Sequence, residues 1–192
     1  DGVIALNAND NTPTPAVCRS LRKQFGNFDL AMLNYNSAGP YPSCFSNLTD
    51  SEKELEHQRI LNRNFDYMCE LLEVLSPRAV LPFAGAYVIS GLQAHKNRYL
   101  GTTSWDACAA EVLTRRPDEI ICLLREGDTL DLCSLTNDKP YIPIDLDAQS
   151  RYIDLVLKEL KYEYEHDDFP SIAQLLVDLE IGSSRMLSRG ER

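Results

Sequence analysis

The sequence has no hydrophobic run near the ~18 residues that indicate a membrane-spanning helix, and it has no cluster of Lys or Arg. Its 19 basic residues are outnumbered by 29 acidic residues, so the formal net charge is −10 at pH 7. Proteins bind nucleic acid by neutralising phosphates with clustered cations. The composition therefore argues against a nucleic-acid partner and a membrane partner, and a hydrophobic fraction of 44% is ordinary for a soluble globular protein.

The cysteines lack the short paired spacings that zinc and iron–sulfur sites use. Six cysteines stand far apart in the chain: Cys18, Cys44, Cys69, Cys108, Cys122 and Cys133. We interpret them as reduced, mostly buried thiols of a cytoplasmic protein. Cys44 as a nucleophile would need a nearby base that the sequence does not identify.

Familiar catalytic motifs are also missing. The sequence has no G-x-S-x-G elbow, no P-loop and no G-x-G-x-x-G turn. The three histidines, His57, His95 and His166, lie far apart, and we assign none of them to a ligand pair; Asp167 and Asp168 beside His166 are interpreted as a solvated charge run. We interpret each as structural or exposed.

Residues 1–83 instead show a regular alternation of short apolar runs with helical patterns. Thr14-Pro15 fits the start of one helix and Gly26 its end, while Thr49-Asp50-Ser51-Glu52 is a capping box that opens a long second helix. Apolar runs predict strands at 3–7, 28–35 and 78–83. This β-α-β-α-β order implies parallel strands, whose following loops, 8–13, 35–46 and 83–92, open on one edge of the sheet, where such folds bind ligands.

Each of these loops has a functional and a structural interpretation. The cluster Asn7-Ala8-Asn9-Asp10-Asn11 could hold a hard cation through oxygen ligands, or it could be an Asx-turn before the helix. The loop at 34–45 offers small residues and two tyrosines to a ligand, or it is an ordered surface loop stiffened by prolines. The third, Pro82 to Tyr87, favours close packing of strand against helix.

Beyond residue 92 the pattern changes. We expect a short helix at Trp105 to Thr114 and a hairpin that pairs 119–124 with 129–132 around Arg125-Glu126-Gly127-Asp128. Two further helices are expected from Asp147 to about Tyr164 and from Pro170 to Glu180, before a polar, frayed tail at 183–192.

Five segments, in order along residues 1–135, resemble the metallo-β-lactamase-fold branch that contains the cytidine monophosphate N-acetylneuraminic acid hydroxylases and their bacterial relatives. They are Leu6-Asn7-Ala8-Asn9-Asp10-Asn11, Asp29-Leu30-Ala31-Met32-Leu33 with Ser37-Ala38-Gly39-Pro40-Tyr41-Pro42, Leu81-Pro82-Phe83-Ala84-Gly85-Ala86-Tyr87, Asn97-Arg98-Tyr99, and Arg125 to Leu132.

That resemblance implies an αββα sandwich with a metal site at the loop-bearing edge and chemistry by metal-activated water. In that fold an N-terminal half supplies an H-x-H-x-D-H motif, and a later Asp at a strand end can bridge the metals; Asp10 stands in that place. The sequence departs from the pattern in two ways. It has no H-x-H-x-D-H, and Ala84 stands where many members have a last His ligand. Because the Rieske cluster motif of the hydroxylases is absent as well, hydroxylation is not implied.

We therefore expect an α/β fold in which residues 1–135 form the C-terminal half of a metallo-β-lactamase-like αββα sandwich and residues 136–192 form a helical extension. The sequence begins at Asp1, without Met, directly before a strand, which fits part of a longer protein. Half a sandwich leaves one sheet face and an edge uncovered. The expected protein partners are therefore the missing N-terminal half or a second copy in a homodimer.

The predicted function is that of a fragment of a metal-dependent hydrolase acting on a small sugar- or nucleotide-linked substrate, inactive without the rest of the protein. A zinc, iron or manganese ion would belong to the full-length protein, with Asp10 as a ligand and Asn9 and Asn11 around it. Tyr41 and Tyr87 would line the substrate cleft. The alternative is a non-catalytic binding or assembly module that has lost its metal site.

Overall fold

The computed structural model describes residues 2–9, 11–83, 85–162, 170–188 and 190. The chain divides into two compact units, Asp1–Glu159 and Leu160–Arg192, and each is described separately. The division expected from the family resemblance, after residue 135, stays a prediction.

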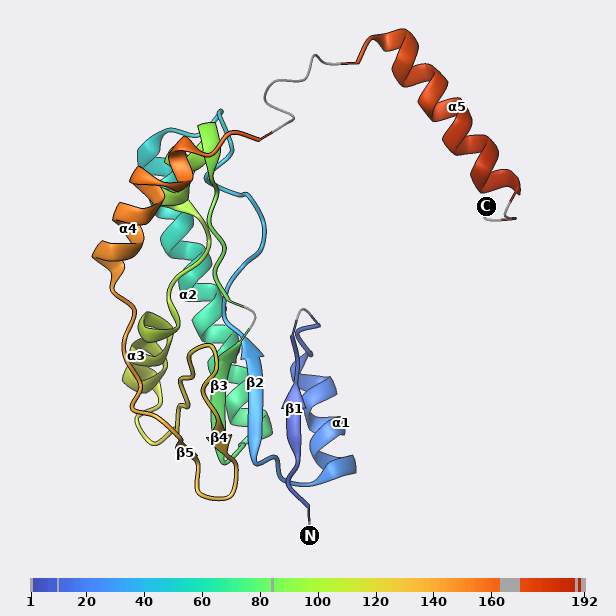
Figure 1. Cartoon of the computed structure of the whole chain (residues 1–192). Helices are drawn as coiled ribbons and strands as arrows, with labels where there is room; N and C mark the ends of the chain where they lie inside the picture. The colour runs from blue at the N-terminus through green and yellow to red at the C-terminus, as the bar shows by residue number, and fades with distance from the viewer. Residues whose placement is uncertain (1, 10, 84, 163–169, 189, 191–192) are drawn as a thin grey trace. The chain divides into compact units, whose positions relative to one another are not determined.

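The first unit is built on a three-stranded parallel sheet in the order β1-β2-β3. Its strands are β1 (Ala5–Asn7), β2 (Leu30–Asn34) and β3 (Ala79–Phe83). The crossover helices are α1 (Pro15–Phe25) and α2 (Asp50–Leu75) (Figure 1). The predicted β-α-β-α-β order is confirmed, so the loops that follow the three strands leave the same edge of the sheet.

The local features that the sequence predicts are present at the start of both crossover helices and at the end of α1. The Thr14 hydroxyl accepts a hydrogen bond from the Val17 N–H (3.3 Å), and Gly26 ends α1 with a φ of 84°. In α2 the Thr49 hydroxyl accepts from the Glu52 N–H (3.3 Å), while the Glu52 carboxylate accepts from the Thr49 N–H (2.8 Å). The capping box is confirmed.

The two faces of the sheet belong to two cores. Ala31, Leu33 and Val80 face the helices and join a core built from α1, α2 and the later helix α3 (Trp105–Arg115). The alternate positions, Leu30 and Leu81, face the opposite side. That side is covered by apolar side chains from the segment after α3: Cys122, Leu124, Leu130, Leu132 and Leu135.

The prediction of a hairpin between 119–124 and 129–132 is wrong. Its turn is present, because the Arg125 N–H donates to the Asp128 carboxylate (2.9 Å). The 119–124 segment lies beside β3 instead, where Ile121 forms a parallel bridge with Val80. That pairing does not lengthen because Pro82, the next residue of β3 in phase with Val80, has no N–H to donate. The only antiparallel pair in the described residues joins β4 (Leu130–Asp131) to β5 (Thr136–Asn137).

The other helices described in the first unit are short. They are η1 (Gly91–Tyr99), α3, which confirms the helix expected at 105–114, α4 (Leu146–Leu155) and η2 (Leu157–Glu159). The helix expected to reach about residue 164 is wrong in length. At Glu159 the N–H bonds to Val156 (3.2 Å), three residues back, so α-helical bonding has already ended.

The second unit contains α5 (Ile172–Ser188). The tail expected to fray from residue 183 is helical through Ser188, because Met186 and Leu187 continue the helical spacing of Leu175 and Leu179. None of the helices that the structure describes is long and apolar enough to cross a membrane.

The α/β class is therefore shown, as a small parallel sheet among helices. The finer assignment to half of an αββα sandwich stays a proposal.

Candidate functional site

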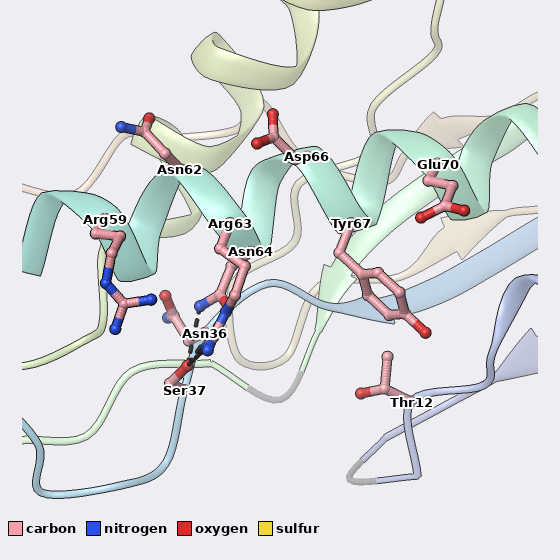
Figure 2. Close-up of a pocket in the computed structure, with 10 residues that line it drawn as sticks. All are labelled: Thr12, Asn36, Ser37, Arg59, Asn62, Arg63, Asn64, Asp66, Tyr67 and Glu70. Carbon is pink, nitrogen blue, oxygen red and sulfur yellow. Dashed lines mark hydrogen bonds between the residues drawn. The ribbon is translucent and has the colours of Figure 1, made fainter. Parts of the chain in front are cut away.

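A cleft of about 800 Å³ lies beside the loops that leave the sheet. Its lining comes from Thr12 after β1, from Asn36 and Ser37 after β2, and from the side of α2 between Arg59 and Glu70 (Figure 2). Both loops follow the carboxyl ends of parallel strands, which is where open α/β sheets bind ligands.

One end of the cleft is rich in hydrogen-bond donors. The Arg63 guanidinium donates to the Ser37 hydroxyl (3.3 Å) and to the Asn64 amide oxygen (3.2 Å), and the Asn64 amide NH₂ donates to the same hydroxyl (3.1 Å). These three side chains converge in Figure 2. Within the part of the chain that the structure describes, Arg63 forms no ion pair. Its charge is therefore the one in the donor-rich end that is best placed to bind an anion.

Arg59 extends this positive end but is partly neutralised. Its guanidinium donates twice to the Glu56 carboxylate (2.6 and 2.9 Å), and the Tyr41 hydroxyl donates to the same oxygen (2.8 Å). The bonds from Arg59, and then from Tyr41, lower the pKa of Glu56, while the bond to Glu56 raises the pKa of Arg59. Arg59 therefore stays charged beside the cleft but shares that charge with Glu56.

The other end of the cleft offers acceptors. The Asp66 carboxylate pairs with Arg115, and Glu70 lies one turn further along α2. The Tyr67 hydroxyl donates to the Pro13 carbonyl (3.1 Å), which holds the loop after β1 against α2. Carboxylate and hydroxyl oxygens at this end are suited to the hydroxyl groups of a ligand.

A buried amide fixes the loop that carries Ser37. The Asn36 side chain, which is 8% exposed, donates to the Thr103 carbonyl (2.9 Å) and accepts from the Thr103 N–H (2.8 Å). The Ser37 N–H donates to the Gly101 carbonyl (3.0 Å). These bonds between segments more than sixty residues apart hold the position of Ser37 in the cleft.

The loop with the predicted metal ligand has an ordered turn around it. The Asn7 amide oxygen accepts from the Asn9 N–H (3.1 Å), and Asn9 has a φ of 36°, so this is an Asx-turn. The Asn11 N–H donates to the Ala8 carbonyl (2.9 Å). Asp10 lies outside the described residues, so its predicted role as a metal ligand stays a prediction.

The two tyrosines predicted to line a substrate cleft lie in different surroundings. Tyr41 packs edge-on against Phe45, with ring centres 5.0 Å apart, and its hydroxyl is bonded to Glu56. The Tyr87 hydroxyl donates to the Gly39 carbonyl (2.9 Å), and the ring lines a separate cavity of about 420 Å³. Neither lines the cleft beside Arg63.

Tyr35 lies between that cavity and a third one of about 440 Å³, which Asn9 also lines. It is 1% exposed, and its hydroxyl has no hydrogen-bond partner among the described residues. Burial raises its pKa, so the hydroxyl stays protonated. The hydroxyl lies against Gly85, where an added Cβ would be 3.1 Å from the oxygen.

The described residues contain no set of three or more His, Cys, Asp or Glu side chains placed to hold a metal ion. His57 is bonded through Nδ1 to the Leu100 carbonyl (2.6 Å), and His95 to that of Leu92 (3.1 Å). Ala84 and His166 lie outside the described residues. A metal bound near the Asn7 loop would therefore need further ligands.

The cysteines are free thiols, of which Cys18, Cys108 and Cys122 are buried and Cys133 is exposed. Burial raises the pKa of Cys108 to about 12, so this thiol is not a nucleophile at neutral pH.

Sequence reasoning missed the α2 side of the cleft. Arg63 and Asn64 stand on α2, where no site is predicted from the sequence. A signal was present, because Asn62 and Asn64 are weak helix formers in the middle of a 26-residue helix. Such residues are tolerated there when their side chains have another use.

In the comparisons with known proteins, no family model, no curated protein and no solved structure matches the chain.

Proposed function

We propose that the first unit binds a small ligand carrying an anionic group and hydroxyls, of the sugar- or nucleotide-linked class, in the cleft beside Arg63. The observation that carries this proposal is the arginine without an ion pair among the described residues, at the loop-bearing edge of a parallel sheet. Arg63 and Arg59 would bind the anion, and Ser37 and Asn64 would orient it by hydrogen bonds.

The polarity of the cleft supports this ligand class over an apolar one. Its positive end is followed along α2 by Asp66, Tyr67 and Glu70, whose oxygens can accept bonds from sugar hydroxyls. A purely anionic ligand such as free phosphate would leave these acceptors unused.

Calorimetric titration of the chain with cytidine monophosphate and with N-acetylneuraminic acid tests the proposal. Binding of at least one of them is expected, and Arg63→Gln should weaken it at least about tenfold, since a hydrogen bond between charged groups contributes ~1.5–3 kcal/mol. Arg19→Gln, on α1 and outside the cleft lining, is the matched control and should bind like the wild type. No heat with either compound, or equal binding by Arg63→Gln, would contradict the proposal.

A second candidate is the metal-dependent hydrolase indicated by the family resemblance, of which this chain would be one part. It is favoured by the oxygen-rich Asn7–Asn11 loop, which borders a cavity of about 440 Å³ through Asn9, while the next residue, Thr12, lines the cleft beside Arg63. Because the described residues do not supply a ligand set, no catalytic step is assigned to them.

Metal analysis of the full-length protein tests this second candidate. Bound zinc, iron or manganese should be present at about one or two ions per chain and should fall with Asp10→Ala but not with Asp118→Ala, a change on an exposed turn. If the protein contains no metal, or if Asp10→Ala does not change its metal content, the hydrolase interpretation is contradicted. The non-catalytic binding module is then the remaining interpretation.

A further inference from the structure

The helix α5 carries an apolar stripe that the described residues of its own unit leave exposed. The stripe is spaced three and four residues apart along one side of the helix, and its side chains are exposed: Ile172 77%, Leu175 47%, Leu176 61%, Leu179 68%, Met186 55% and Leu187 71%. In proteins most of the stability of such a 17-residue helix comes from packing of its apolar face. We therefore expect the stripe to pack against another apolar surface.

The stripe has the repeat of a coiled-coil seam. Ile172, Leu175, Leu179, Gly182 and Met186 follow one another at alternating steps of three and four residues. Gly182 has open space at its Cβ position, so a side chain from a second helix can approach the backbone there. Leu179 of the second helix is bulky enough to fill the space at Gly182.

The charges beside the seam decide the orientation. Asp178 and Arg185 flank it on the same side, seven residues apart. If two copies of the helix run antiparallel with Leu179 opposite Gly182, then Asp178 of each lies beside Arg185 of the other. A parallel pair would place Asp178 beside Ser183 and would leave both charges without complement.

We propose that α5 is a self-association element that pairs with α5 of a second copy of this chain in an antiparallel arrangement. The apolar stripe supplies the contact, and two symmetric Asp178–Arg185 pairs set the direction. Two helices of this length bury less than the ~1,200–2,000 Å² of a stable interface, so the dimer is weak, with a dissociation constant of the order of micromolar.

Sedimentation equilibrium of the whole chain, from about 1 to 500 µM, tests the pairing. The wild type should pass from monomer to dimer over this range. Leu179→Asp should stay monomeric, while Ser184→Asp, which adds the same charge on the side of α5 away from the seam, should dimerise like the wild type. Fluorescence of Trp105, the one tryptophan of the chain, which lies in the first unit, checks that this unit is folded in both.

Charge exchange tests the direction. Asp178→Arg alone and Arg185→Asp alone should each weaken the dimer about tenfold or more, because like charges meet twice. An equimolar mixture of the two variants should dimerise as tightly as the wild type, because each variant then faces its opposite. A chain that is monomeric throughout, a dimer that survives Leu179→Asp, or a mixture no tighter than either variant would overturn the proposal.

Discussion

At the scale of single residues, the cleft depends on side chains that bond across long stretches of chain. Asn36 joins the loop after β2 to Thr103, and Asn64 reaches from α2 to Ser37. The Asn36 amide is buried and the Asn64 amide partly buried. Such groups are expensive to leave without partners, so their bonds fix one arrangement of the loops. Tyr35 is the exception, because its buried hydroxyl has no partner among the described residues.

Removal of the Tyr35 hydroxyl should not destabilise the protein. Tyr35→Phe removes only a buried oxygen without a partner, so the free energy of unfolding should stay the same or rise by up to about 1–3 kcal/mol. Tyr67→Phe loses the bond to the Pro13 carbonyl (3.1 Å). In this variant the free energy of unfolding should instead fall by about 0.5–1.5 kcal/mol. Urea denaturation measures both. A clear loss of stability in Tyr35→Phe would show that its hydroxyl is hydrogen-bonded.

At the scale of elements, one carboxylate joins the amino ends of the strands. Asp29 accepts hydrogen bonds from the Ile4 N–H before β1 and from the Arg78 guanidinium before β3, both at 2.9 Å. Arg78 also donates to the Cys133 carbonyl (3.1 Å), which ties the segment covering the second sheet face to the same point. The bond from Ile4, and then that from Arg78, lowers the pKa of Asp29 from its ordinary 3.8.

A lowered pKa fixes the sign of a pH effect. The carboxylate contributes its full stability above its unfolded pKa, near 3.9, and loses it as the pH falls through the lower folded value. The wild type should therefore be more stable than Asp29→Asn by a constant amount above about pH 5, and this difference should shrink below about pH 4.

Thermal unfolding at a series of pH values measures this difference. Asp118→Asn, on an exposed turn, controls for the loss of one carboxylate's charge. A difference between the wild type and Asp29→Asn that grows as the pH falls would contradict the assigned bonds.

The sequence predicted correctly those structural features that depend on residues close together in the chain. Thr14, Gly26 and the Thr49–Glu52 capping box act within one turn of helix, and each was located correctly. The hairpin failed because the partner of Ile121 is Val80, about forty residues earlier. Pro82 marks the limit of that pairing, but its effect can be seen only once the neighbouring segment is known.

At the scale of the whole molecule, the edge that holds the cleft was predictable and the residues that make it were only partly so. Parallel strands place their following loops together, which located Thr12 and the 36–37 loop. Arg63 and Asn64 could not be assigned because their use depends on which side of α2 faces those loops. Tyr41 and Tyr87 do not line this cleft. The Tyr41 hydroxyl bonds to Glu56, beside Arg59, and the Tyr87 hydroxyl bonds to the Gly39 carbonyl.

Self-association also belongs to this scale, since α5 lies in the second unit and the cleft in the first. The two proposals are independent. Leu179→Asp should abolish the dimer and leave ligand binding unchanged, and Arg63→Gln should have the opposite pattern.

The central claim, that Arg63 binds the anionic group of a ligand, is tested most directly by a cycle of four dissociation constants. Cytidine monophosphate and uncharged cytidine are titrated into the wild type and into Arg63→Gln. In the wild type the phosphate should improve binding at least about tenfold, and in Arg63→Gln most of that advantage should disappear, since the coupling between the two groups is what the cycle isolates. The same phosphate advantage in both proteins would contradict the account, because the anion would then be bound by other groups.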